Sequence, residues 1–251
     1  MHGLNGNNYS TYFLIVARFI GVTAINPIFN SKIINNPLRI VLSLLFAFMV
    51  YPFVIRNSII NTTTLYGFLL VKEVIIGCIL GFILGIPFWI IKSIGNIIDV
   101  IRGEQLGQIM NPGTSEPSST IANLLDQAFL AYFMCGNGLI FIIGACLKSF
   151  VWQNPTSFIF NKSLLSEVYV ISIIQNYMYI SVLYATPIIL LLIVLEIVLS
   201  LISSFMPNLN VTMLSLPLKS SLALFLLIFY VQFLYHENLN LFQIIQKHLF
   251  N

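Results

Sequence analysis

Several ionisable residues lie inside long apolar stretches of the sequence, where charged side chains are rare. They include Arg18, Lys72, Glu73, Glu196 and Lys219. A charge in hydrocarbon is costly, so each of them needs a partner, a cavity or a helix interface. Two kinds of chemistry fit: polar contacts that hold helices or subunits together, and a relay of protons or ions. A relay normally needs several acids in series, and only Glu73 and Glu196 lie deep in apolar segments. We therefore favour packing contacts and keep the relay as the alternative.

Lys72 and Glu73 are neighbours in the sequence. On a helix, adjacent side chains point about 100° apart, and the pairs that meet are three or four residues apart. The sequence therefore predicts that these two side chains do not pair with each other, and that each finds its partner on another helix.

Glycines recur at every fourth position of the same apolar segment, at Gly77, Gly81 and Gly85. Small residues at this spacing form a smooth stripe on which the backbone of another helix can approach closely. Packing within the chain and contact between subunits explain the stripe equally well. Pro87 follows two residues later and predicts a kink in the segment.

The sequence holds no recognisable catalytic constellation. All three histidines lie toward the ends of the chain, at His2, His236 and His248, so none can join a buried serine or cysteine in a triad. There is no HExxH motif and no glycine-rich phosphate loop followed by Lys-Ser or Lys-Thr. The cysteines lack the spacing of a metal or redox site. The sequence thus predicts a protein that is not an enzyme and that binds no cofactor or metal.

The elements that carry these residues belong in a membrane. The chain has 251 residues, of which 58% are hydrophobic and 8% charged, with a mean hydropathy of +0.95. An ordinary soluble domain has roughly 25% charged residues. A net charge of +3 without a basic cluster gives no surface for nucleic acid. We expect an all-α, multispanning membrane-type protein built from long helices and helical hairpins.

Six apolar segments divide the sequence, approximately Tyr12–Ile28, Leu38–Ile55, Leu65–Ile94, Ile121–Phe150, Val168–Phe205 and Val211–Tyr235. Because about 20 residues cross a hydrocarbon core, the first, second and sixth fit single spans. The third and fourth are long enough to tilt or protrude, and the fifth is too long for one span. Pro187 predicts a kink or a break near Tyr184–Pro187. The loops are short, which predicts one domain over residues 1–251.

The basic residues of the loops do not set an orientation. With six spans, one side collects four of them, Lys32, Arg39, Lys92 and Arg102. The other side also collects four, Arg56, Lys148, Lys162 and Lys247. Cytoplasmic loops normally carry an excess of Lys and Arg. Either some long segments are hairpins that do not cross the membrane, or partner subunits impose the final position, and we take the tie as a hint of assembly.

A polar, turn-rich island over residues 103–120 separates two of the apolar segments. Its glycines and prolines, which include Gly103, Gly107 and Pro112, cannot all lie in one helix. Non-helical backbone at membrane depth is tolerated only where it is buried in protein or lines a water-filled cavity. The island therefore lies outside the bilayer or faces a passage.

Two motifs resemble one family. The first joins the run 103–107 (Gly-Glu-Gln-Leu-Gly), Asn111-Pro112 and the run 121–125 (Ile-Ala-Asn-Leu-Leu). The second joins the run 205–211 (Phe-Met-Pro-Asn-Leu-Asn-Val) and the run 216–220 (Leu-Pro-Leu-Lys-Ser). Together, in this order and spacing, they resemble the T subunit of the type III secretion export apparatus (the SctT/FliR family). Glu104-Gln105 and Lys219 look more like the virulence injectisome branch than the flagellar one.

The resemblance implies a structural and gating subunit of an export gate in the bacterial inner membrane. The implied partners are the R-type and S-type subunits (SctR/FliP and SctS/FliQ families), the U-type switch subunit and secreted proteins in transit. The T subunit's helices form long hairpins within a funnel-shaped assembly raised toward the periplasm. The function that competes with this one is a small ion-coupled secondary transporter, with Glu73 and Glu196 in its translocation path.

The resemblance also implies that the island projects into the channel as a plug. The implied plug residues are Gly103, Glu104, Gln105, Gly107, Gln108, Ile109, Met110, Asn111, Pro112, Gly113, Thr114, Ser115, Glu116 and Pro117. Flagellar members are more apolar beyond the position of Asn111-Pro112, where this chain is rich in Gly, Ser and Thr. Without the resemblance, a solvated loop with no gating role is the better interpretation of the island.

Overall fold

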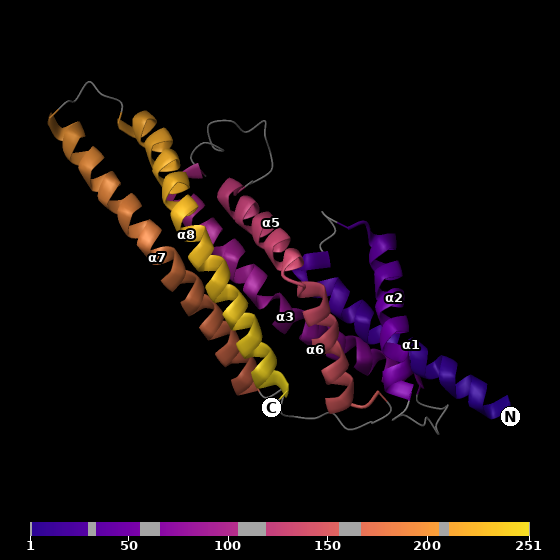
Figure 1. The fold of residues 1–251 in the computed structure, drawn as a ribbon. Coiled ribbons are helices and arrows are strands. Elements are labelled where there is room, and N and C mark those ends of the chain that lie inside the picture. The colour runs from indigo at the N-terminus through magenta and orange to yellow at the C-terminus, as the bar shows by residue number, and fades with distance from the viewer. Residues whose placement is uncertain are drawn as a thin grey trace. The chain divides into compact units, whose positions relative to one another are not determined.

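The computed structural model describes residues 2–29, 34–55, 66–104, 119–155, 167–205 and 211–250. The described residues form helices and contain no strand, which confirms the predicted all-α fold (Figure 1). The elements are α1 (His2–Ile25), the short 3-10 helix η1 (Pro27–Phe29), α2 (Asn36–Ile55), α3 (Tyr66–Arg102), α5 (Thr120–Cys135), α6 (Gly138–Trp152), α7 (Glu167–Phe205) and α8 (Val211–Phe250).

Four of the described helices are long and apolar enough to cross a membrane: α2, α3, α7 and α8. The pair α5 and α6 passes the same test only when both are counted as one broken span. In α1, the described stretch Tyr9–Ile25 is also an apolar helix, and the single span predicted over Tyr12–Ile28 stays a prediction. The chain is a multi-pass membrane protein, as predicted.

The helices form two compact units. The first combines residues 1–86, 134–170 and 242–251, and the second combines residues 87–133 and 171–241. The chain passes from one unit to the other four times, inside α3, α5, α7 and α8. The single domain over residues 1–251 stays a prediction.

Helices α1, α2 and α6 and the first half of α3 build the first unit. Its core contains Leu14, Phe19, Ala47 and Phe150, each at most 3% exposed. Helices α1 and α3 approach each other closely, because Gly21 of α1 lies against the backbone of Gly77 in α3. This close contact fixes the position of Arg18, one turn before Gly21.

The second unit is built from α5, α7, α8 and the second half of α3, around an aromatic cluster. Phe88 of α3 packs on Phe129 and Phe133 of α5, with both pairs of ring centroids 5.1 Å apart. Tyr235 of α8 packs on Phe129 at 5.4 Å, and its hydroxyl donates to the Leu125 carbonyl at 3.4 Å. The cluster holds α5 between α3 and α8, so the beginning of α5 has a fixed place beside the end of α3.

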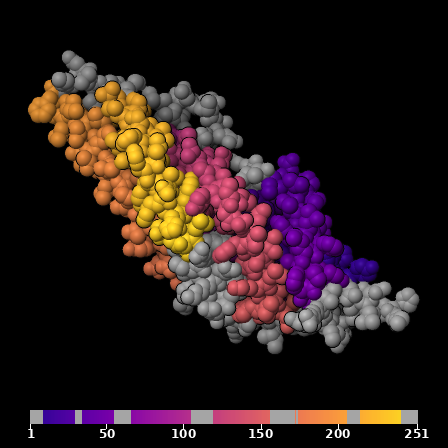
Figure 2. Space-filling model, in the orientation of Figure 1, coloured from indigo at the N-terminus to yellow at the C-terminus, as the bar shows by residue number. Residues whose placement is uncertain are grey.

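Helices α7 and α8 run antiparallel and side by side (Figure 1). Figure 2 shows α8, in yellow, alongside α7, in orange. Much of their surface is apolar and exposed: only 17% of the most apolar stretch of each helix is buried. Such surfaces suit lipid or the helices of a partner.

Two of the differences between the described helices and the predicted segments concern breaks. The fourth segment is interrupted at Gly136-Asn137, where Asn137 adopts the left-handed conformation with φ 61°. We predicted a kink or a break near Tyr184–Pro187; the break is wrong, because α7 runs unbroken from Glu167 to Phe205, and the kink stays a prediction. In an apolar setting an unsatisfied backbone group is expensive, which favours continued helix around a proline. The Thr186 hydroxyl donates to the Val182 carbonyl at 2.7 Å, within the turn that precedes Pro187.

Candidate functional site

The two ends of the polar island lie together in the second unit. Helix α3 ends at Arg102, and Gly103 follows with φ 90°, a conformation that favours glycine. The Gly103 N–H donates to the Val100 carbonyl at 3.1 Å and tightens the last turn. The reversal directs Glu104 back toward the beginning of α5.

Glu104 joins the two helices through its carboxylate. It accepts hydrogen bonds from the Thr120 N–H, at 3.2 Å to each oxygen, and from the Thr120 hydroxyl. On the other side, Arg102 Nη2 lies 2.6 Å from Glu104 Oε2. One carboxylate therefore links the last turn of α3 to the first turn of α5.

Asp99 makes a second link one turn earlier. Its Oδ1 lies 2.8 Å from Arg102 Nη2, and its Oδ2 accepts from the Ala122 N–H at 3.1 Å. The first N–H groups of a helix have no partner inside that helix, and its N-terminus attracts negative charge. Two acids near the end of α3 thus serve as caps for α5.

Farther from the island, α3 and α5 pack closely at Gly95 and Ala122, and we call this contact the seam. A methyl group added at Gly95 of α3 would overlap the Cα atom of Ala122 in α5, so the backbones touch here. One turn away, Lys92 Nζ lies 3.8 Å from Asp126 Oδ2. We call Asp99, Arg102, Glu104 and Thr120 the neck, because they join both ends of the island.

The electrostatics of the neck favour a charged Glu104. Partial burial raises the pKa of this carboxyl, but the hydrogen bonds from Thr120 and Arg102 more than offset that effect. The pKa of Glu104 therefore lies below its ordinary value. The carboxylate stays ionised around neutral pH and keeps all its contacts.

Of the predicted plug residues, the structure describes only Gly103 and Glu104. Both belong to the turn at the end of α3. The others lie outside the described residues: Gln105, Gly107, Gln108, Ile109, Met110, Asn111, Pro112, Gly113, Thr114, Ser115, Glu116 and Pro117. Their place in a plug remains a prediction.

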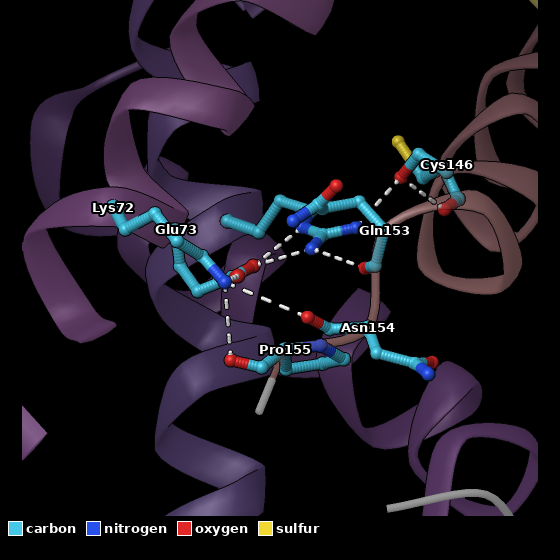
Figure 3. A network of polar contacts seen from close by, with 8 residues as sticks. Lys72, Glu73, Cys146, Gln153, Asn154 and Pro155 are labelled. Atoms are coloured by element: carbon cyan, nitrogen blue, oxygen red, sulfur yellow. Dashed lines mark hydrogen bonds and ion pairs between the residues drawn. The ribbon is translucent and has the colours of Figure 1, made fainter. Parts of the chain in front are cut away.

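A second polar cluster lies in the core of the first unit (Figure 3). Arg18 of α1 is 1% exposed, and its Nε donates to Glu73 Oε2 of α3 at 2.6 Å. Its other nitrogens donate to the Ser149 hydroxyl at 3.1 Å and to the Gln153 carbonyl at 3.0 Å. The guanidinium carbon lies 3.9 Å from the ring centroid of Phe150, a cation–π distance. Arg18 thus joins α1, α3 and α6.

The structure shows that the predicted separation of Lys72 and Glu73 is wrong. Lys72 Nζ lies 3.1 Å from Glu73 Oε1. Although the two side chains leave the helix in different directions, the long, flexible lysine stem lets the ammonium group turn back to the carboxylate. Burial of both residues in one polar cluster favours this conformation, since an unpaired charge there is costly.

Three charges thus meet in this cluster: two cations and one carboxylate. The second cation, Lys72, also donates to the Asn154 and Pro155 carbonyls at 3.5 and 3.3 Å (Figure 3). Carbonyl groups just beyond a helix C-terminus carry partial negative charge and suit cations. The segment after α6 therefore offsets the positive charge that Glu73 leaves over, so the cluster has the features of a structural joint.

The glycine stripe of α3 faces α1 inside the chain. A methyl group at Gly77 would overlap the Arg18 carbonyl oxygen, and one at Gly81 would lie 2.7 Å from the Val22 carbonyl oxygen. Gly85 is buried in α3 as well. The structure thus places Gly77 and Gly81 in packing between helices of the same chain.

The remaining predicted pair joins α7 and α8. Lys219 Nζ lies 3.1 Å from Glu196 Oε1. The Lys219 side chain is 8% exposed, whereas the Glu196 side chain is 60% exposed. The pair supports the α7–α8 hairpin, and it leaves one side of the Glu196 carboxylate at the surface.

Reasoning from the sequence missed most of the neck. Asp99, Arg102 and Thr120 were not selected as functional residues. A signal was present, because Asp99 and Arg102 are three residues apart, just before Gly103 and an acid. Such spacing places charges on one face at a helix end. The partners of Arg18 on α6, Ser149 and Gln153, are distant in sequence and left no comparable signal.

A chain of long apolar helices, with buried ion pairs and a polar joint between two helix ends, is a membrane protein of the multi-pass class. Comparison with known proteins narrows this class. The family model described as "Bacterial export proteins, family 1" matches residues 9–244, and the chain belongs to this family.

Relatives come from both secretion and flagellar systems. The chain is 33% identical over 227 residues to the Yop proteins translocation protein T of Yersinia pestis, which covers 88% of this chain and 85% of that protein. It is 26% identical over 232 residues to the surface presentation of antigens protein SpaR of Salmonella typhimurium, with 88% and 87% covered. It is 25% identical over 225 residues to the flagellar biosynthetic protein FliR of Buchnera aphidicola subsp. Acyrthosiphon pisum, with 88% and 85% covered.

These findings confirm the predicted membership in the SctT/FliR family and the greater similarity to the injectisome branch. The homologues are proteins of type III secretion and flagellar export, and thus components of multi-subunit machines.

Proposed function

We propose that this chain is a structural and gating subunit of a type III export gate in the bacterial inner membrane, and that it is neither an enzyme nor a carrier of a cofactor. In this proposal residues 103–118 obstruct the protein-conducting channel at rest, and α3 and α5 anchor them. The observation that carries the proposal is the neck, which ties both ends of the island to two packed helices. A segment that obstructs a channel must be held at both ends. A solvated loop without a gating function does not require four linked polar residues.

The ion pairs weigh against the transporter. Glu73 contacts two cations, and Glu196 contacts Lys219. Each acid lies in an ion pair that joins two helices, α1 and α3 for Glu73 and α7 and α8 for Glu196, as a packing contact does. The contacts therefore support a structural function for both acids.

The proposed partners are the R-type and S-type subunits, the U-type switch subunit and secreted proteins in transit. The wide apolar surfaces of α2, α7 and α8 support assembly with other membrane helices, since 22% or less of the most apolar stretch of each is buried. In the assembled gate the chain is raised toward the periplasm, and its hairpins form part of the funnel.

The test of the gating function removes residues 108–118 from the chain in the assembled complex. Because the neck and the seam remain, we expect the complex to assemble while small ions and dyes leak across the membrane. A matched control replaces the same residues with a Gly/Ser segment of equal length. It keeps the length of the island and changes only its side chains. Unchanged tightness and unchanged export in the deletion would refute the gating function.

A further inference from the structure

We infer that the neck stays closed when the gate opens: Asp99, Arg102, Glu104 and Thr120 hold the ends of α3 and α5 together in the resting and the conducting state. They are therefore positioning residues, and Glu104, at the beginning of the segment 103–118, anchors this segment to α5. This inference rests on the proposed function, because it concerns how the proposed gate opens.

The first argument is the balance of charges. Arg102 lies between two carboxylates, Asp99 and Glu104, and these carboxylates also accept the N–H groups of Thr120 and Ala122. One cation and the beginning of α5 thus offset two negative charges. Parting the helices would take the N–H groups of Thr120 and Ala122 away from two carboxylates that share one cation, and it would leave these first N–H groups of α5 without acceptors.

The second argument is burial. The side chain of Asp99 is 3% exposed, that of Arg102 is 11% exposed and that of Glu104 is 17% exposed. The partner that Asp99 would lose is the Ala122 N–H, and a buried acceptor that loses its donor is destabilised. The neck is therefore a poor hinge, because opening it would remove a donor from the buried Asp99 carboxylate.

The third argument is the seam beneath the neck. The backbone of α3 at Gly95 touches α5 at Ala122, so the helices cannot pivot apart at their ends without parting here as well. Phe88 and Phe129 then continue the contact toward the core. The α3–α5 pair is therefore one rigid support, and the change that clears the passage leaves it intact.

The decisive experiment bridges the neck covalently. Glu104→Cys and Thr120→Cys are combined in the full complex and linked by a short bis-thiosulfonate reagent, which a reductant removes. We expect export with the bridge to remain within about twofold of export after reduction. Each single-cysteine variant, treated with the same reagent, controls for modification of the native cysteines, among which Cys135 is exposed. A drop of tenfold or more that reduction restores would overturn the inference, because α3 and α5 would then have to separate.

A second pair of variants tests whether the neck positions the gate at all. Thr120→Val removes the hydroxyl donor to Glu104, and Thr120→Ser keeps it. We expect the valine variant to raise the resting leak of ions several-fold in a complex of unchanged subunit composition, with the serine variant close to the parent. Equal leak in the two variants would overturn the positioning function.

The outcomes separate the two proposals. If removal of residues 108–118 causes no leak and leaves export unchanged, the gating function itself fails. If that deletion leaks but the bridged neck blocks export, only the inference of a closed neck fails.

Discussion

Glu73 lies between two cations in a closely packed core, and this arrangement decides what the residue can do. Its oxygens contact Arg18 at 2.6 Å and Lys72 at 3.1 Å, and its side chain is fully buried. Desolvation of such a group is costly, and the contacts offset the cost only while both partners remain. Loss of Glu73 alone should therefore destabilise the protein more than removal of Glu73 together with one of its cations.

The Glu73→Met variant should strongly destabilise the protein. It leaves two buried cations without a carboxylate, and breaking a buried pair in this way costs about 3–5 kcal/mol. The double variant Arg18→Met/Glu73→Met removes one of these cations and should recover part of the loss. Thermal unfolding of the purified complex measures both effects. If the two substitutions simply add, with no recovery in the double variant, Arg18 and Glu73 are not coupled as the structure indicates.

Glu104 should make stability depend on pH in the acidic range. Its folded pKa lies below the ordinary value of 4.5, because the hydrogen bonds from Thr120 and Arg102 outweigh its burial. The folded state therefore holds the proton less tightly than the unfolded state. The contribution of the carboxylate is fully present above pH 4.5 and is lost as pH falls through the folded pKa.

The measurement compares unfolding midpoints of the parent and the Glu104→Gln variant over this range. Asp99 and Arg102 are present in both proteins, so the comparison isolates the replacement of the Glu104 carboxylate by an amide. We expect the difference in midpoint to be largest near neutral pH and to shrink at lower pH. A constant difference across the range would show that the charge of Glu104 does not contribute.

At the scale of the helices, close approach and hairpin pairing show what sequence patterns can and cannot reveal. The four-residue spacing of Gly77 and Gly81 indicated a smooth helix face, and the structure supplies α1 as its neighbour. The spacing alone did not distinguish a helix of the same chain from another subunit. The break at Gly136-Asn137 was missed because the apolar composition continues on both sides of it, although Gly136-Asn137-Gly138 is a recognisable turn signal.

Replacing Gly81 by leucine should disturb the α1–α3 contact. Even a methyl group here would lie 2.7 Å from the Val22 carbonyl oxygen, so a larger side chain must push the helices apart. Overpacking of this kind typically costs about 1–3 kcal/mol. We expect Gly81→Leu to lower the yield and thermal stability of the complex more than Gly81→Ala does. Gly67→Leu is a matched control, since nothing lies within 4 Å of a methyl group at that glycine. Equal effects at the two glycines would contradict the close packing.

The Glu196–Lys219 pair should support assembly rather than export chemistry. Lys219→Met leaves Glu196 without its cation on an apolar surface, and Glu196→Gln leaves the largely buried Lys219 without its carboxylate. We expect either variant to lower the stability of the complex, while the complexes that survive still export. Subunit composition and export of a reporter protein are measured on the same membranes. Intact assembly with abolished export would instead favour the proton relay.

For the whole molecule, composition and the family motifs predicted a multi-pass, all-helical protein of type III export, and these predictions hold. The neck was not predicted because it depends on side chains from two helices that the island separates. Asp99 and Ala122 are far apart in the sequence, and only the packing of α3 on α5 brings them together. Patterns along one helix report burial and spacing, whereas contacts across helices require the tertiary structure.

The last prediction concerns the chain without its partners. Many large apolar side chains are exposed on α7 and α8, including Phe205, Ile228 and Phe229, which are 84%, 71% and 72% exposed. Lipid can cover apolar side chains, but the largely exposed Glu196 carboxylate is costly to place in hydrocarbon. A partner helix that brings a hydrogen-bond donor resolves this cost. We therefore expect the chain expressed alone to be degraded or heterogeneous, and coexpression with R-type and S-type subunits to yield a defined complex. Size-exclusion chromatography in mild detergent measures this, and a monodisperse, long-lived monomer would count decisively against obligate assembly.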